Sequence, residues 1–252
     1  MEPVTVYFVG GADTPREMFK PLADALRNRF DAERRTVRLR TIQAYGMIGE
    51  GSSGIADVGA DTGAEAGVGG GVMKHWYAAG RDARLKPEQA GQSIGGQRVQ
   101  RQVRMLGAST PLLFIGHGGG GVAAYHAAEL LEREGCDVRF VAQVGSPKVP
   151  IGSEFRARVG YLAKKGIGVE GDPMTWQGSW AHDNYKLNAH RYPGLLYSAG
   201  ESRTRLYAPE RIALVDIRGQ HPSYFSPMKG KGPVSNLAKS LNVLWDWFGQ
   251  VL

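Results

Sequence analysis

The stretch of the sequence most suited to chemistry is a glycine turn at residues 116–121, which read GHGGGG. An apolar run, PLLFI at 111–115, precedes it, and the small residues Val122 and Ala123 follow it. A glycine-rich turn between a strand and a helix can cradle a phosphate, hold a dinucleotide, or present a nucleophile at a sharp bend. The neighbouring residues discriminate between these three chemistries.

Phosphate and dinucleotide binding both need residues that this turn lacks. A phosphate-binding loop requires a lysine followed by serine or threonine after the glycines, and Val122 and Ala123 stand there instead. A dinucleotide fingerprint normally follows the first strand and is matched by an acidic residue about 20 positions further on, after a second strand. Glu132 and Glu134 lie at the end of the expected helix, so dinucleotide binding is disfavoured.

The turn resembles the G-H-S-x-G-G motif of lipases and esterases in the α/β-hydrolase superfamily. The resemblance holds at every position except the nucleophile, where Gly118 stands in place of serine. Three later stretches resemble lipase class 3 and related serine hydrolases, in the order of that family: QVGSPKVPIGSEF, GDPMTWQG and GQHPSYF. The resemblance runs from Leu112 to Phe225 and implies a three-layer α/β/α fold with a mostly parallel central sheet.

Carried over position by position, the resemblance implies a three-membered catalytic site. Gly118 occupies the nucleophile position, Asp172 corresponds to the catalytic acid, and His221 corresponds to the catalytic base. In such a site the histidine takes the proton of the nucleophile, while the aspartate fixes the histidine tautomer and stabilises the imidazolium. Taken alone, Asp172 before Pro173 is also typical of a turn, and His221 is also compatible with a surface histidine.

The resemblance further implies an oxyanion hole made of backbone N–H groups. Gly119, after the nucleophile position, is expected to supply one donor, and the turn at Gly11 and Ala12 after the first strand the other. Because these donors do not depend on side chains, they can survive the loss of the serine.

Substrate contacts are expected from His117, Trp176 and Tyr224. For His117, packing within the turn is the alternative. Aromatic residues crowd the stretch between Asp172 and His221, where family members often place a cap or an acyl pocket; core packing is the simpler explanation for most of them: Trp176, Trp180, Tyr185 and Tyr192. The spacing of His182, Asp183 and His190 fits no familiar metal site, so we expect no metal and no other cofactor.

A glycine at the nucleophile position is expected to abolish most hydrolysis, because losing a serine nucleophile costs about 10⁶ in turnover in comparable triads. Two explanations stay open. The chain is either an inactivated variant of a serine hydrolase that acts on small esters or acyl groups, or a non-catalytic ligand-binding or scaffold protein on the same fold.

Alternating strand and helix patterns position these residues. Apolar runs predict buried strands, and Thr36–Ile42 alternates in the manner of a strand nearer a sheet edge. Asp13 or Thr14 is expected to cap a first helix with Pro15 at its first position. The expected strands lie at 4–9, 36–42, 111–116, 138–147, 158–167 and 211–217, and the expected helices at 15–26, 86–106, 122–131 and 237–248. This alternation predicts one α/β domain over residues 1–252.

Tyr45–Met73 differs from the rest because glycine and alanine dominate it. Such a composition buries too little surface to fix one conformation, which predicts a flexible surface loop. The alternative is a mobile lid over a pocket, because long loops in compact domains are often functional.

The bulk composition, 42% apolar and 22% charged, is that of a soluble globular protein. The net charge is +7, but the basic residues are scattered and no known module accompanies them, so nucleic-acid binding is not expected. Cys136 is the only cysteine, which excludes a disulfide within the chain. No signal peptide or run of about 20 apolar residues is visible, which predicts a cytoplasmic location without a transmembrane segment. A mature secreted form that has lost its signal is the alternative.

Overall fold

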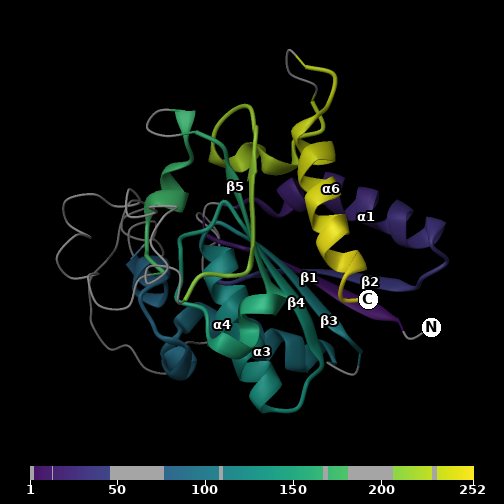
Figure 1. The fold of residues 1–252 in the computed structure, drawn as a ribbon. Coiled ribbons are helices and arrows are strands. Elements are labelled where there is room, and N and C mark those ends of the chain that lie inside the picture. The colour runs from purple at the N-terminus through teal and green to yellow at the C-terminus, as the bar shows by residue number, and fades with distance from the viewer. Residues whose placement is uncertain are drawn as a thin grey trace, which may run out of the picture.

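The computed structural model describes residues 3–12, 14–45, 77–107, 110–166, 170–180, 207–228 and 232–252. Within them, one six-stranded sheet has the order β2-β1-β3-β4-β5-β6, and every strand pairing is parallel (Figure 1). The strands are β1 (Val4–Gly10), β2 (Val37–Gln43), β3 (Leu112–His117), β4 (Val138–Val144), β5 (Val159–Lys164) and β6 (Arg211–Val215). The predicted α/β class with a mostly parallel sheet is confirmed.

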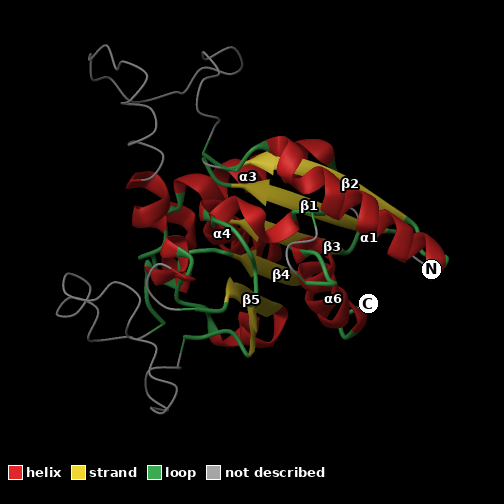
Figure 2. Cartoon of the chain, turned by 90° about the horizontal axis from the view of Figure 1, so that it is seen from above, coloured by secondary structure: helices red, strands yellow, loops and turns green. Residues whose placement is uncertain are grey.

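Helices cover both faces of this sheet, which gives three layers (Figures 1 and 2). On one face lie α3 (Ile94–Leu106) and α4 (Gly119–Arg133), and on the other α1 (Lys20–Ala32) and α6 (Asn236–Gly249). Short 3-10 turns connect the layers: η1 (Arg16–Phe19), η2 (Pro87–Gln92), η3 (Ser153–Arg158), η5 (Pro173–Trp176) and η7 (His221–Phe225).

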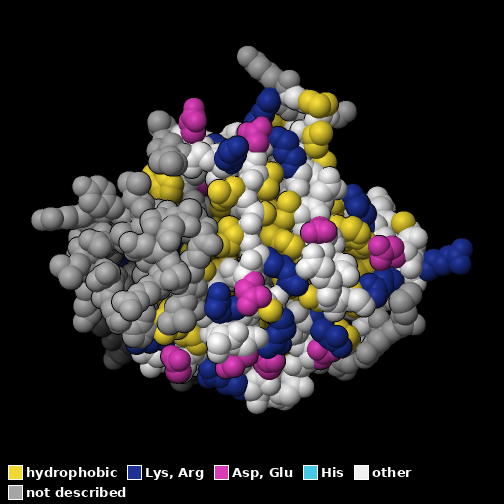
Figure 3. All heavy atoms as spheres, viewed as in Figure 1, with side chains coloured by type: hydrophobic (Ala, Val, Ile, Leu, Met, Phe, Trp, Pro, Cys, Tyr) yellow, Lys and Arg dark blue, Asp and Glu magenta, His cyan; other side chains and the backbone are white. Residues whose placement is uncertain are grey.

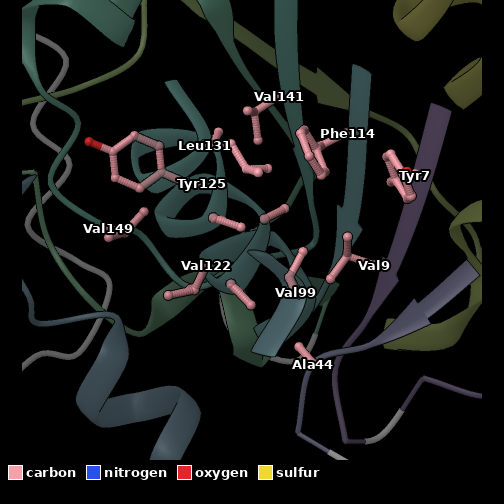
Figure 4. Close-up of a cluster of buried hydrophobic side chains, with 14 of the residues drawn as sticks. Tyr7, Val9, Ala44, Val99, Phe114, Val122, Tyr125, Leu131, Val141 and Val149 are labelled. Carbon is pink, nitrogen blue, oxygen red and sulfur yellow. The ribbon is translucent and has the colours of Figure 1, made fainter. Parts of the chain in front are cut away.

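The alternation of side chains along β1 divides the core between the two faces. Tyr7 and Val9 point into the cluster that contains α3 and α4, which Figure 4 shows in close-up. Val6 and Phe8 point into the opposite cluster, which contains α1 and α6. Because β1 is central and covered on both sides, all seven of its residues are buried. The edge position predicted for β2 is confirmed, and its exposed residues alternate with half-buried ones at the start of the strand.

Three helix boundaries differ from the predictions. The helix expected from Lys86 divides into η2 and α3, because the Ser93 hydroxyl accepts a hydrogen bond from the Gly96 N–H (2.9 Å) and so caps a new helix. The helix expected from Val122 begins at Gly119, so three glycines form its first turn. Pro15 is not the first helical residue, since it precedes η1 in an extended conformation.

The strand order places a topological switch point at the carboxyl ends of β1 and β3. The chain leaves β1 to form β2 on one side and later returns to form β3 on the other side. Connections that diverge in this way open the crevice where ligands bind in open parallel sheets. Gly10 and His117 are paired in register at the ends of these two strands, so the two predicted turns meet there.

The described residues cover the predicted loop at 45–73 and the predicted absence of a transmembrane segment to different extents. The proposed lid at Tyr45–Met73 lies outside the described residues, except for Tyr45. Among the residues that are described, no helix is both long enough and apolar enough to cross a bilayer. On the face shown in Figure 3, basic side chains are interspersed with acidic ones, in agreement with the scattered charge of the sequence.

Candidate active site

Gly118 forms the apex of the bend between β3 and α4. Its backbone has φ 57° and ψ −133°, a combination that costs a residue with a side chain about 1–3 kcal/mol and that glycine adopts freely. The Gly118 N–H donates to the carbonyl of Val144 (3.1 Å), and the Gly118 carbonyl accepts from the Gly121 N–H (3.1 Å). The bend is therefore held from both sides, with position 118 at its tip.

The other glycines of the turn are required by close packing. A Cβ on Gly120 would lie 2.1 Å from the carbonyl oxygen of Val9, and a Cβ on Gly116 would lie 2.4 Å from the Cα of Gly121. The first turn of α4 thus lies directly against the backbones of β1 and β3. The glycine density of the sequence follows from this approach of a helix to two strands.

Asp172 and His221, predicted as acid and base, lie in contact. Asp172 follows β5, and its Oδ1 accepts from the Met174 N–H (3.0 Å) to cap η5. His221 is the first residue of η7, in the loop after β6, and its Nδ1 lies 2.8 Å from Asp172 Oδ2. Asp172 is 1% exposed. Since a carboxylate only accepts, the imidazole donates from Nδ1, which makes Nε2 the nitrogen that can take a proton from a neighbour.

Tyr224, predicted as a substrate contact, instead supports the carboxylate. Its hydroxyl donates to Asp172 Oδ2 (2.7 Å) and accepts from the Lys164 N–H (2.9 Å), and the side chain is fully buried. Burial and the neighbouring Asp172 raise the pKa of Tyr224, so the hydroxyl keeps its proton. Tyr224 reaches Asp172 because η7 is a 3-10 turn, in which side chains three residues apart lie on one face. His221 and Tyr224 therefore both contact Asp172.

His117, the second predicted substrate contact, also faces the interior. It is fully buried, and its ring lies 4.2 Å from the ring of His221. Its Nδ1 lies 2.8 Å from Thr14 Oγ1, and its Nε2 lies 3.2 Å from the His221 carbonyl oxygen. Burial, with His221 as the second cause, lowers the pKa of His117 well below its usual value, so this ring is neutral at pH 7. Thr14, expected as a helix cap, is a partner of His117.

The oxyanion donors predicted from the sequence divide into two groups. The N–H of Gly119 opens α4, where the first N–H groups have no partner within the helix. The Gly11 N–H does not fit the prediction, because it donates to the His117 carbonyl and to Thr14 Oγ1 (3.2 Å each). Ala12, the next residue of the same turn, is half-buried and remains the predicted second donor.

Tyr45 and Ala79 pack beside Gly119. A Cβ at position 119 would lie 2.9 Å from the Cβ of Ala79 and 3.3 Å from the Tyr45 ring. The Tyr45 hydroxyl is itself fixed by a hydrogen bond to the buried Asp82 (3.1 Å). The side chains of Ala79 and Tyr45 therefore leave no room for a Cβ at position 119. The sequence did not predict this contact.

Lys148 holds the loop that carries Asp172. Its backbone N–H donates to Gln177 (2.8 Å) and its ammonium donates to the carbonyl of Thr175 (2.8 Å), although the residue is only 9% exposed. Burial lowers the pKa of Lys148 to about 8. On the same loop the half-buried Trp176, still a predicted substrate contact, packs against Gly171.

The buried ammonium predicts a pH dependence of stability. Because the pKa of Lys148 falls from 10.5 to about 8 on folding, the folded chain binds this proton more weakly, and stability should rise between about pH 8 and 10. We expect Lys148→Met to remove about 1–3 kcal/mol of this rise, measured as the free energy of unfolding in urea at both pH values. Lys165→Met, at an exposed position, should keep the wild-type profile. Equal slopes for both variants would contradict the prediction.

Metal binding has no support in the described part of the chain. No group of three or more His, Cys, Asp or Glu side chains there could hold an ion. The residues whose spacing argued against a metal site, His182, Asp183 and His190, lie outside the described residues, as do Tyr185 and Tyr192.

Comparison with known proteins adds no identification. The sequence matches no protein-family model, and a search of curated proteins finds no significant match. The bend at Gly118 and the Asp172–His221 pair are therefore the features of the chain that bear on function.

Proposed function

We propose that this chain is a lipase- or esterase-type α/β-hydrolase whose site binds carboxylic esters or acyl groups, and that Gly118 at the nucleophile position leaves it inactive or nearly so. The observation that carries the proposal is the 2.8 Å hydrogen bond between Asp172 and His221. These residues follow β5 and β6, and the Gly118 bend follows β3. The chain order of nucleophile position, acid and histidine is that of α/β-hydrolases.

The backbone at Gly118 supports the same proposal. A nucleophile elbow is a strained bend from strand to helix that exposes one side chain above the sheet. Gly118 has positive φ, follows β3 directly and precedes α4 directly. A glycine relieves the strain of this bend and at the same time removes the hydroxyl that would form an acyl-enzyme.

The residues of the site have definite roles in this proposal. With a serine at position 118, His221 would accept the hydroxyl proton at Nε2 while Asp172 stabilises the imidazolium. The Gly119 and Ala12 N–H groups would stabilise the oxyanion of the tetrahedral intermediate. With glycine at position 118, an ester can occupy the same site but no covalent intermediate forms.

The test is to restore the hydroxyl. We expect Gly118→Ser to raise kcat/KM for short-chain p-nitrophenyl esters by at least about 10³-fold over the chain with Gly118. Gly118→Ala is the matched control, because it introduces the same backbone strain without a nucleophile. If folded Gly118→Ser hydrolysed esters no faster than Gly118→Ala, the hydrolase assignment would lose its support, and a ligand-binding or scaffold role would be favoured.

A further inference from the structure

A chain of hydrogen bonds connects the turn after β1 with the backbone of His221. The Gly11 N–H donates to Thr14 Oγ1 (3.2 Å), and Thr14 Oγ1 lies 2.8 Å from His117 Nδ1. His117 Nε2 lies 3.2 Å from the carbonyl oxygen of His221. Thr14 is anchored in turn by the side-chain amide of Gln43, which donates to the Thr14 carbonyl (3.0 Å).

The direction of every bond in this chain is fixed. The His221 carbonyl can only accept, so His117 carries its proton on Nε2. Nδ1 of His117 is then an acceptor, and the Thr14 hydroxyl must donate to it. That hydroxyl accepts from the Gly11 N–H at the same time. Each hydrogen bond therefore has one direction, and His117 has one tautomer. Thr14 and His117 are 2% and 0% exposed, which shields both bonds from competing water.

The end of this chain constrains His221 at its backbone and at a face of its ring. The two imidazoles are 4.2 Å apart with an interplanar angle of 31°, so the His117 ring limits the tilt of the His221 ring. The bond to the His221 carbonyl fixes the backbone from which that ring projects. Asp172 then holds Nδ1 (2.8 Å), so His221 is fixed at its backbone, its ring face and one ring nitrogen.

We propose that His117 is a positioning residue, which together with Thr14 sets the orientation of the His221 imidazole. Its catalytic meaning rests on the proposed function, but the geometric claim does not. A purely space-filling role would be met equally by phenylalanine, which keeps an aromatic ring against His221. The hydrogen bonds distinguish the two roles.

The experiment observes the Nδ1–H proton that His221 shares with Asp172, by NMR of the unmodified chain labelled with ¹⁵N-histidine. His221→Ala and Asp172→Asn assign this low-field resonance among the six histidines. We expect His117→Phe to shift and broaden the resonance or abolish it, because the ring stays but both hydrogen bonds are lost. His117→Gln, which can still donate to the His221 carbonyl, should restore the resonance in part.

Thr14→Val is the second variant and does not alter either histidine. It keeps the shape of the side chain but removes the hydroxyl that donates to His117 Nδ1, so the His221 resonance should again shift and exchange faster with water. This variant also decides the matter if His117→Phe does not fold. An unchanged resonance in folded His117→Phe, or in folded Thr14→Val where His117→Phe does not fold, would overturn the proposal.

Activity separates this inference from the proposed function. In the Gly118→Ser background, His117→Phe should lower kcat about 10- to 100-fold while KM changes little, because only the orientation of the base is lost. If Gly118→Ser is inactive but the resonance responds to His117→Phe, the hydrolase assignment fails and the positioning role stands. If Gly118→Ser is active and the resonance does not respond, the reverse holds.

Discussion

Asp172→Asn, introduced into the Gly118→Ser variant, should remove nearly all of the restored esterase activity, a loss of about 10⁴-fold in kcat where the assay reaches that far. The two carboxylate oxygens of Asp172 accept from different partners: Oδ1 from the Met174 N–H, and Oδ2 from His221 and Tyr224. An asparagine amide cannot satisfy both sides. If its oxygen faces Met174, its NH₂ group faces His221 and forces the proton of the imidazole onto Nε2, which is the wrong tautomer for a base.

The matched control is Tyr224→Phe in the same background. It removes one donor from the same oxygen but leaves the tautomer of His221 unchanged. We therefore expect a loss of only about 10-fold in kcat, in line with one hydrogen bond to a charged group. Steady-state kinetics on p-nitrophenyl esters compare the two variants. Similar losses in both would contradict the tautomer role of Asp172, because Asp172→Asn would then cost no more than the loss of one hydrogen bond to the carboxylate.

Among substitutions of alanine for a glycine in the turn at residues 116–121, Gly120→Ala should be the most destabilising. The new Cβ would lie 2.1 Å from the Val9 carbonyl oxygen, and 2.7 Å from the carbonyl carbons of Val9 and Gly10. These are backbone atoms of the central strand, so no side chain can move aside. Helix α4 must shift off β1, and we expect the free energy of unfolding in urea to fall by about 3 kcal/mol or more.

Gly91→Ala in η2 provides the comparison. Nothing lies within 4 Å of a Cβ at that position, so the same chemical change should alter stability by no more than about 0.5 kcal/mol. Equal stabilities of the two variants would mean that α4 does not pack against β1 as closely as the structure indicates.

The strands were predictable because buried parallel strands are apolar along their whole length. β1, β3 and β4 stand out as such runs, and β2 shows the alternation of an edge strand. Helix boundaries were less predictable, because propensity treats glycines as turn residues. At residues 119–121 close packing outweighs that propensity. A Cβ would meet the Ala79 side chain at Gly119, the β1 backbone at Gly120 and the Ser146 side chain at Gly121.

The site was predictable in its main pair but not in its support. Asp172 and His221 came from ordered motifs, whereas the roles of His117 and Tyr224 depend on where side chains point. One signal was available for His117: it shares strand parity with Leu113 and Ile115, which face the α1 and α6 side of the sheet where η7 lies. Lys148 and Thr14 had no such signal, because Lys148 contacts the backbone of a loop distant in sequence and Thr14 contacts the side chain of the distant His117.

The supports of the Asp172–His221 pair have a consequence for how such a chain changes over generations. Tyr224, Met174 and His117 hold the pair, and these residues also close the packing between the sheet, η5 and η7. If the chain is the inactivated hydrolase proposed above, selection for folding alone is therefore sufficient to retain the pair after the loss of a nucleophile. On that proposal, one substitution at position 118 ends catalysis and one restores it, while the pair is kept as part of the fold.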